Sequence, residues 1–274
     1  MAVDQHYENF PVASFLVPPR MRPHVVAIYR FARHADDVAD EGDVDVATRL
    51  SQLAELRAEV EALFRGQPVI APTVRALSRL RDAGIESTPF LNLLSAFSQD
   101  VRTQRYNSYS ELEDYCRRSA NPVGRLMLAL SNVRDAAPLQ ASDQICTSLQ
   151  LINFCQDAAI DASRGRIYVP QEDFATFDVS DADFPQHPQH QALMRFQCGR
   201  ARSLMLSGSP LLAVLRGRLR LEIAFTMAGG LRILEKIADN EFDVRIRPKL
   251  RWYDSPQLLL IALRLLLNSG HRPT

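Results

Sequence analysis

The chain has 274 residues with 32 basic and 32 acidic side chains, so its formal net charge at pH 7 is zero. This balance argues against a nucleic-acid-binding protein, and any functional group of basic residues must be local. No apolar run approaches the ~20 residues that a membrane-spanning helix needs. The four cysteines show no Cys-x-x-Cys spacing, so we expect reduced, buried thiols in a cytoplasmic protein.

Helical periodicity runs through almost the whole chain, and turn residues such as Gly, Pro and Asn separate its segments. We predict helices over residues 25–40, 46–64, 73–83, 89–103, 109–118, 123–133, 142–162, 193–207, 221–240 and 256–268. The polar segment 178–191 is expected to be a surface loop, with His187 and His190 in solvent. Because we find no internal repeat and no linker, the sequence predicts one all-α domain over residues 1–274.

The first predicted helix ends in an acidic motif. Asp36 and Asp40 lie one helical turn apart and Arg33 precedes Asp36 by three residues, so the three side chains share one face. One explanation is a solvent-exposed helix end with an intrahelical ion pair. Carboxylates near a helix C-terminus oppose the helix dipole, however, and a bound divalent cation would offset that penalty.

A second polar stripe lies in the predicted helix 142–162. Gln150, Asn153, Asp157 and Asp161 follow at steps of three, four and four, which return to the same face of a helix. The residues around the stripe are apolar, so its carboxylates need a partner or a metal ion. Asp157 and Asp161 are one turn apart, a spacing that lets two carboxylates hold one hard cation.

The two acidic motifs together predict helices that face each other across a bundle. Four carboxylates around one cavity repel one another unless cations bind between them. Mg²⁺ binds a few carboxylates together with waters and substrate phosphates. We therefore expect a diphosphate substrate, with Arg33, Arg166 and Lys249 as candidate donors to it. A Mg²⁺ site in an apolar cavity suits the ionisation of isoprenoid diphosphates.

Several motifs, in their order along the chain, resemble those of the squalene and phytoene synthases, the head-to-head prenyltransferases. They are the acidic motif 36–40, Asp100 ahead of Arg105-Tyr106, Tyr115 followed by the segment 119–124, the polar stripe of 150–161, and the segment 165–170. The resemblance covers nearly the whole chain. It implies an all-α isoprenoid synthase bundle around a central cavity, and dependence on Mg²⁺.

Within this family, the segments 8–16, 29–42 and 228–237 are similar to the bacterial branch that forms hydroxysqualene. That similarity implies conversion of presqualene diphosphate and water to hydroxysqualene and diphosphate, in squalene and hopanoid biosynthesis. A presqualene diphosphate synthase would act before this protein, and a flavin-dependent hydroxysqualene dehydroxylase would act after it.

The resemblance also implies a role for each site residue. The expected Mg²⁺ ligands are Asp36, Asp40, Asn153, Asp157 and Asp161. Arg33 and Arg166 would neutralise the departing diphosphate, and the residues expected to guide the carbocation are Tyr29, Tyr115 and Gln150. The alternative for Tyr115 is a core tyrosine with one buried hydrogen bond.

The chain departs from the wider family at three places. Gln156 stands where the family usually has Arg, and Pro11 lies where relatives often carry a Ser-rich diphosphate-binding segment. The pair 229–230, both glycines, falls where relatives place tyrosines. We weigh two explanations for the pair Gly229-Gly230: it leaves room in the substrate site for a water that captures the cation, or it lets two helices approach closely.

Two other functions stay open. A sister enzyme would condense two farnesyl diphosphates to presqualene diphosphate, or would complete squalene with NADPH. A non-catalytic family member would act as a binding or assembly module, although the acidic motifs speak against this. We expect a cytoplasmic protein, and the poor solubility of a C30 substrate leaves peripheral contact with the inner membrane open.

Overall fold

The structure, a computed structural model, describes residues 16–269. The similar segment 8–16, apart from Leu16, and the departure at Pro11 lie outside the described residues. Residues 16–269 form helices joined by turns and loops, and none of them lies in a strand. The predicted all-α class is confirmed.

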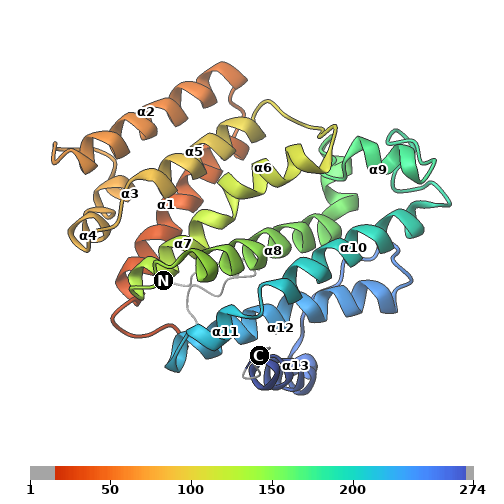
Figure 1. Cartoon of the computed structure of the whole chain (residues 1–274). Coiled ribbons are helices and arrows are strands. Elements are labelled where there is room, and N and C mark those ends of the chain that lie inside the picture. Colours follow the sequence, from red (N-terminus) through yellow and green to blue (C-terminus); the bar gives the residue numbers. More distant parts are fainter. Residues whose placement is uncertain (1–15, 270–274) are drawn as a thin grey trace.

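The helices follow one another along the chain as shown in Figure 1. They are α1 (Arg22–Asp40), α2 (Val46–Phe64), α3 (Pro72–Arg75), α4 (Ser78–Asp82), α5 (Thr88–Asp100), α6 (Tyr109–Ser119), α7 (Asn121–Leu130), α8 (Ala136–Ser163), α9 (Gln171–Thr176), α10 (His190–Ser207), α11 (Leu211–Val214), α12 (Gly217–Asp239), the 3₁₀ turn η1 (Trp252–Asp254) and α13 (Ser255–Asn268).

The long helix α8 lies in the middle of the bundle. It packs against α6, α7, α10, α11 and α12, and its buried residues run from Pro138 to Ala158. The four cysteines are all buried and free, as expected, and Cys116, Cys155 and Cys198 belong to this core. A second apolar core, with Phe31, Val60 and Phe90 among its fully buried members, joins α1, α2 and α5.

The structure corrects several element predictions. Helix α8 begins at Ala136 and not at residue 142, because a proline such as Pro138 is tolerated in the first helical turn. The predicted helix 73–83 is two short helices, α3 and α4. His190 is not solvated. It begins α10, is buried, and its Nδ1 lies 2.6 Å from the carbonyl oxygen of His187.

Among the described residues, no helix is long and apolar enough to cross a membrane. The bundle interior holds a small void of about 10 Å³, lined by residues of α7, α8, α11 and α12 that include Gly124, Ile145 and Ile223. A second void of about 10 Å³ lies beside Phe154 and Tyr168.

Candidate active site

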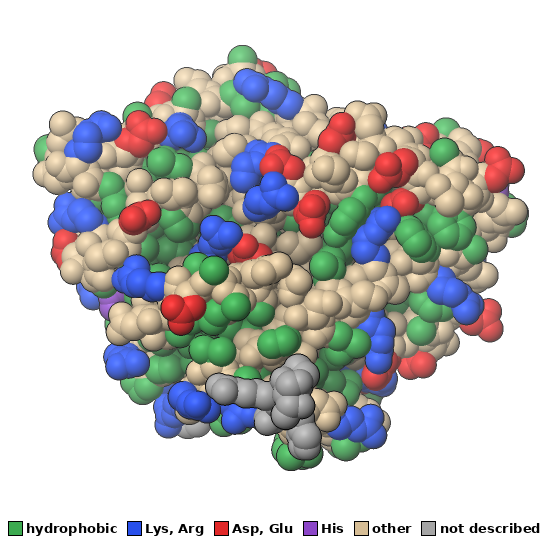
Figure 2. Space-filling view, in the orientation of Figure 1, with side chains coloured by type: hydrophobic (Ala, Val, Ile, Leu, Met, Phe, Trp, Pro, Cys, Tyr) green, Lys and Arg blue, Asp and Glu red, His purple; other side chains and the backbone are tan. Residues whose placement is uncertain are grey.

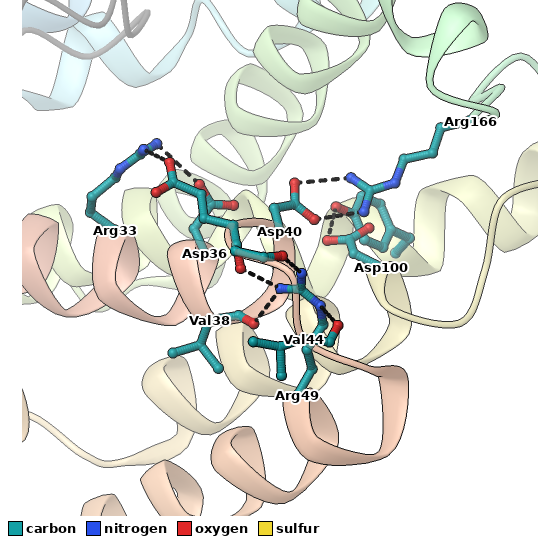
Figure 3. A network of polar contacts seen from close by, with 11 residues as sticks. Arg33, Asp36, Val38, Asp40, Val44, Arg49, Asp100 and Arg166 are labelled. Atoms are coloured by element: carbon teal, nitrogen blue, oxygen red, sulfur yellow. Dashed lines mark hydrogen bonds and ion pairs between the residues drawn. The ribbon is translucent and has the colours of Figure 1, made fainter.

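The first acidic motif occupies the end of α1, where Arg33 gathers three carboxylates (Figure 3). Its guanidinium lies 3.3 Å from Asp36 Oδ2, 2.8 Å from Asp37 Oδ1 and 2.8 Å from Glu41 Oε1. One guanidinium does not neutralise three carboxylates, and the C-terminal end of a helix adds further negative potential. The predicted Arg33–Asp36 pair is confirmed, and the site keeps an excess of negative charge.

Arg49 of α2 fixes the loop that follows this motif. Its guanidinium donates to the carbonyl oxygens of Val38, Glu41, Gly42 and Val44, at distances from 2.6 to 3.1 Å. A helix end leaves carbonyl groups without intrahelical partners, and Arg49 supplies donors to them. The acidic end of α1 is thus held in place from a neighbouring helix.

The first acidic motif is joined to the segment after α8 by an ion pair between Asp40 and Arg166 (Figure 3). Arg166, just beyond the end of α8, donates to Oδ2 of Asp40 at 3.0 Å and to Oδ1 at 2.6 Å. This bidentate pair joins residues 126 positions apart in the chain. The contact brings the end of the first motif to the segment that directly follows the second; that the carboxylates of both motifs bind one substrate stays a prediction.

The predicted polar stripe is present on α8. Gln150, Asn153, Asp157 and Asp161 are all half-buried, on a helix whose neighbouring residues are mostly buried. Asp157 accepts two hydrogen bonds from Arg247, one of them from Nη2 at 3.0 Å. Arg247 lies in the loop after α12, so a third segment of the chain brings a cation to the stripe.

Buried negative charge perturbs two carboxyl groups of the site. Burial, with smaller contributions from the nearby carboxylates of Asp157 and Asp40, raises the pKa of Asp161 to about 6. Burial also raises the pKa of Asp100, the last residue of α5, to about 7, although a hydrogen bond from Tyr115 opposes the shift. The Asp40 carboxylate contributes to both shifts, so it lies close enough to Asp161 and to Asp100 for the charges to interact.

Tyr115 is buried and donates its hydroxyl hydrogen to Asp100 Oδ2 at 2.8 Å. The alternative of a core tyrosine with one buried hydrogen bond therefore describes its contacts, but its partner is an acid of the site. The Tyr115 ring lies 6.3 Å from Phe154 and 6.2 Å from Tyr168, and these two stack at 3.8 Å between centroids. With Tyr106 they form an aromatic cluster, which contacts the site through the hydrogen bond from Tyr115 to Asp100.

Gly230 lies in a tight contact between α12, α8 and α10. A Cβ atom at this position would lie 3.0 Å from Ile152 Cδ1, 3.0 Å from Met205 Cε and 3.1 Å from Leu149 Cδ2. The structure thus favours close helix approach over room for a water, because side chains already fill the space. A role of Gly230 in substrate binding stays a prediction.

Gln156, which stands in place of the family's usual arginine, is buried in α8. Its Nε2 donates to the carbonyl oxygen of Pro248 at 2.7 Å. This bond ties α8 to the loop that carries Arg247, one residue before Pro248. Arg247 of this loop therefore brings a guanidinium to Asp157, next to position 156, where this chain has Gln instead of Arg.

Tyr29 and Lys249 are the predicted residues with the least defined geometry. Tyr29 is half-buried on α1, one turn before Arg33, so the two share a face. Lys249 is exposed, two residues after Arg247. Their roles toward a substrate stay predictions.

The donor chemistry of the site fits Mg²⁺, which prefers carboxylate and amide oxygens. Asp100 Oδ1 is buried, and among residues 16–269 it has no hydrogen-bond partner. In this arrangement, however, Arg166 and Arg247 bind Asp40 and Asp157, and no three His, Cys, Asp or Glu of the described part are grouped as a metal site. Metal binding would require the arginines to release the carboxylates.

Comparison with known proteins matches residues 3–254 to the squalene/phytoene synthase family. A hydroxysqualene synthase of Rhodopseudomonas palustris is 36% identical over 235 residues, 84% of this chain and 79% of the relative. One of Sinorhizobium fredii is 35% identical over 228 residues, 81% and 76% of the two chains. The crystal structure of squalene synthase HpnC from Alicyclobacillus acidocaldarius aligns with a TM-score of 0.80 at 34% identity, covering 87% of this chain and 90% of that one.

These matches place the helical bundle in the all-α isoprenoid synthase class. Within that class, the chain belongs to the squalene/phytoene synthase family. The family resemblance that the acidic motifs indicated is confirmed.

Sequence reasoning missed two arginines of the site, Arg49 and Arg247. Nothing in the sequence around Arg49 points to the loop that it holds. Arg247 belongs to a segment in which Arg245, Arg247, Lys249 and Arg251 alternate with other residues. This run of basic residues after a long helix indicates a group of cations near the site, but the sequence analysis names only Lys249 of it as a diphosphate donor.

Proposed function

We propose that this protein converts presqualene diphosphate and water to hydroxysqualene and diphosphate in a Mg²⁺-dependent reaction. The observation that carries the proposal is the Arg166–Asp40 pair, which joins the first acidic motif to the segment directly after the second. The names of the relatives from Rhodopseudomonas palustris and Sinorhizobium fredii support it. A presqualene diphosphate synthase would supply the substrate, and a hydroxysqualene dehydroxylase would consume the product.

Oxygen atoms from both motifs are the candidate Mg²⁺ ligands. They belong to Asp36, Asp40, Asn153, Asp157 and Asp161. When bound, Mg²⁺ supplies positive charge that stabilises the diphosphate as a leaving group. The excess of carboxylates over guanidinium groups at the end of α1, where Arg33 alone faces Asp36, Asp37 and Glu41, is the feature of this chain that favours cation binding.

The arginines bind the diphosphate in our proposal. Arg166 and Arg247 now pair with Asp40 and Asp157, and both are held at the site by these contacts. A diphosphate offers the same bidentate acceptor geometry as a carboxylate, with more charge. We infer that the two guanidinium groups transfer from the carboxylates to the diphosphate when substrate binds, which frees the carboxylates for Mg²⁺.

The reaction then balances as follows. The carbon–oxygen bond to diphosphate breaks with its electron pair on the leaving group, the cyclopropylcarbinyl cation opens to an allylic cation, and water forms the new carbon–oxygen bond. The rings of Tyr115, Phe154 and Tyr168 present π faces that stabilise cationic carbon. Asp100, with a pKa of about 7, is the candidate acceptor at Oδ1 for the proton that water loses.

One observation favours a second candidate function. The crystal structure with a TM-score of 0.80 is that of a squalene synthase. Under this alternative, the same carboxylates and arginines would act on farnesyl diphosphate, and would form presqualene diphosphate or squalene.

A product assay separates the two functions. Purified protein with Mg²⁺ receives presqualene diphosphate in ¹⁸O-water or, separately, farnesyl diphosphate, each with and without NADPH. We expect ¹⁸O-labelled hydroxysqualene from the first substrate, independent of NADPH, by mass spectrometry. Presqualene diphosphate or squalene from the second substrate would instead establish the sister activity, and no turnover by folded protein would favour a non-catalytic member. The Asp157→Asn variant is the inactive control, and Asp82→Asn, an exposed acid of α4, is the matched active control.

A further inference from the structure

Helix α13 presents a row of apolar side chains to solvent at the edge of the molecule. It packs on α12 and α11 through one side only, where Ala262 and Leu265 are buried. On the other side, Leu259, Leu263 and Leu267 are 50%, 47% and 71% exposed. They repeat every four residues, so they form one stripe along the helix.

The stripe continues into the turn before the helix. Trp252 is 86% exposed and precedes Leu259 by seven residues, a spacing that keeps it on the same side of a helical path. Tyr253, next to it, is 52% exposed, and the two rings lie 5.9 Å apart. An exposed tryptophan beside an exposed leucine stripe is unusual for a surface in water.

Exposed cations flank this apolar stripe. Lys249, Arg251 and Arg264 are exposed, and Figure 2 shows Lys and Arg side chains along the lower edge of the molecule, where α13 lies in Figure 1. The range 244–269 contains a single acid, Asp254. It is 1% exposed and is bound by Arg232 and Lys236 at 3.0 and 2.7 Å. The surface of this range therefore offers cations and no accessible carboxylate.

We propose that α13 and η1 dock the protein on the surface of an anionic lipid bilayer. A helix with leucine and tryptophan on its outer face and Lys or Arg beside them lies in the plane of the membrane interface, with its apolar face in the acyl region. Tryptophan and tyrosine prefer the headgroup level. At 14 residues the helix is too short to span a bilayer, which needs ~20 residues.

Charge favours a bilayer over a second copy of this chain as the occupant. In a two-fold dimer through this face, each copy would present Lys249, Arg251 and Arg264 to the same cations of its partner. Such like-charge contacts oppose association. Anionic headgroups instead complement the cations, while acyl chains cover the leucines. The inference is independent of the proposed reaction, because it needs no substrate.

The chain carries its own probe, since Trp252 is its only tryptophan. The full-length protein is titrated with vesicles of phosphatidylcholine that contain phosphatidylglycerol, and with vesicles of phosphatidylcholine alone. We expect a blue shift of tryptophan emission, quenching by brominated acyl chains, and sedimentation with the anionic vesicles. Binding to neutral vesicles is expected to be weaker.

Two variants test the stripe. Leu263→Glu and Leu267→Glu should each weaken vesicle binding by roughly tenfold or more, given the apolar area lost from the bilayer. The matched control is Ile70→Glu, at a position 83% exposed in the loop before α3, which should bind like the parent. Circular dichroism confirms folding of all three.

The proposal is overturned by either of two results. One is unchanged tryptophan emission of the parent protein in the presence of anionic vesicles. The other is a blue shift that depends on protein concentration without vesicles, together with a doubled mass in solution, which would identify a second copy as the occupant. Quenching by brominated lipid in the unsubstituted protein decides the question even where a variant does not fold.

Discussion

Arg166 binds Asp40 through two hydrogen bonds of 3.0 and 2.6 Å, across 126 positions of sequence. The pair is the contact through which the end of α8 reaches the end of α1. Both side chains remain partly exposed, at 25% and 36%. Exposed ion pairs add only ~0–1 kcal/mol to the free energy of unfolding. The Arg166–Asp40 pair therefore contributes little to stability, and we look for its role in substrate binding.

Substitution of Arg166 tests whether this residue serves the stability of the fold or binds the diphosphate. We expect Arg166→Met to lower kcat/KM on presqualene diphosphate roughly a hundredfold, because a charged hydrogen bond to the diphosphate is lost, worth about 1.5–3 kcal/mol. The free energy of unfolding should change by less than ~1 kcal/mol. Steady-state kinetics and urea unfolding measure the two quantities.

The chain offers a matched control for this variant. Arg125 of α7 also forms a bidentate pair, with Asp143 of α8 at 3.0 and 2.6 Å, away from the acidic motifs. Arg125→Met should leave kcat/KM within about twofold of the parent and should cost a similarly small stability. Equal losses of activity in the two variants would contradict a role of Arg166 at the diphosphate.

Metal and diphosphate should stabilise the protein together. At a ligand concentration of about a hundred times Kd, binding adds about 2.7 kcal/mol, or roughly 5–10 °C in Tm for a chain of this size. We expect this shift with Mg²⁺ plus inorganic diphosphate, and its reversal by EDTA, in differential scanning fluorimetry. Asp36→Asn and Asp161→Asn should abolish it.

Asp143→Asn is the control for the metal experiment, because Asp143 lies on α8 and binds Arg125. Its shift with Mg²⁺ and diphosphate should equal that of the parent. A full shift in Asp161→Asn would show that this carboxylate is not a ligand. The experiment needs no substrate, so it tests the site separately from the reaction.

How far the sequence leads to this site depends on the kind of contact. Helical periodicity alone predicts the polar stripe of α8, because the residues that share one face of a helix are set by their spacing in the sequence. The stripe comprises Gln150, Asn153, Asp157 and Asp161. The Arg166–Asp40 and Arg247–Asp157 pairs did not follow, since partners 126 and 90 positions apart depend on how the helices pack. The family resemblance supplied the general arrangement and not these pairings.

Local chemistry also misled at element ends. The predicted helix 142–162 excludes Ala136-Ala137-Pro138, yet this run is the first turn of α8, with Asp135 as the residue before the helix. His190 was placed in solvent on the polarity of its neighbours, whereas Val179 and Phe184 of the same segment enter the core. Burial of a polar segment depends on a few apolar side chains that composition hides.

The raised pKa of Asp100 predicts a pH dependence of stability. This carboxyl has a pKa of about 7 in the fold against an ordinary value of 3.8, so between these values the native state holds a proton that the unfolded chain has released. The contribution of Asp100 to the free energy of unfolding therefore falls as pH rises from 3.8 to about 7. Asp100→Asn, which keeps an acceptor for Tyr115, should remove this contribution.

Thermal unfolding at pH 5 and pH 8 measures the effect. Between pH 5 and pH 8 the Tm of the parent should fall further than the Tm of Asp100→Asn. Each kcal/mol of unfolding free energy that Asp100 loses over this range corresponds to a difference on the order of 2–4 °C. Asp82→Asn, with an exposed side chain, should follow the parent. Identical pH profiles of the parent and Asp100→Asn would show that Asp100 is ionised throughout this range in the fold.

The neighbouring glycines of α12 should respond in opposite directions to the same substitution. A Cβ at Gly230 would press on Ile152, Met205 and Leu149 at 3.0 to 3.1 Å, whereas a Cβ at Gly229 would meet only Leu250, at 3.6 Å. Overpacking costs about 1–3 kcal/mol, and alanine in a helix interior gains about 1 kcal/mol over glycine. Gly230→Ala should therefore destabilise the protein, and Gly229→Ala should stabilise it.

Urea unfolding of the two variants decides between the explanations for Gly230. If Gly230 serves the close approach of α12 to α8 and α10, Gly230→Ala lowers the urea midpoint of unfolding. The ratio of hydroxysqualene to other products then stays the same. A stable Gly230→Ala protein with altered partition between hydroxysqualene and other products would instead restore the water-capture explanation. Gly229→Ala supplies the baseline, since it adds the same methyl group to the same helix one residue away.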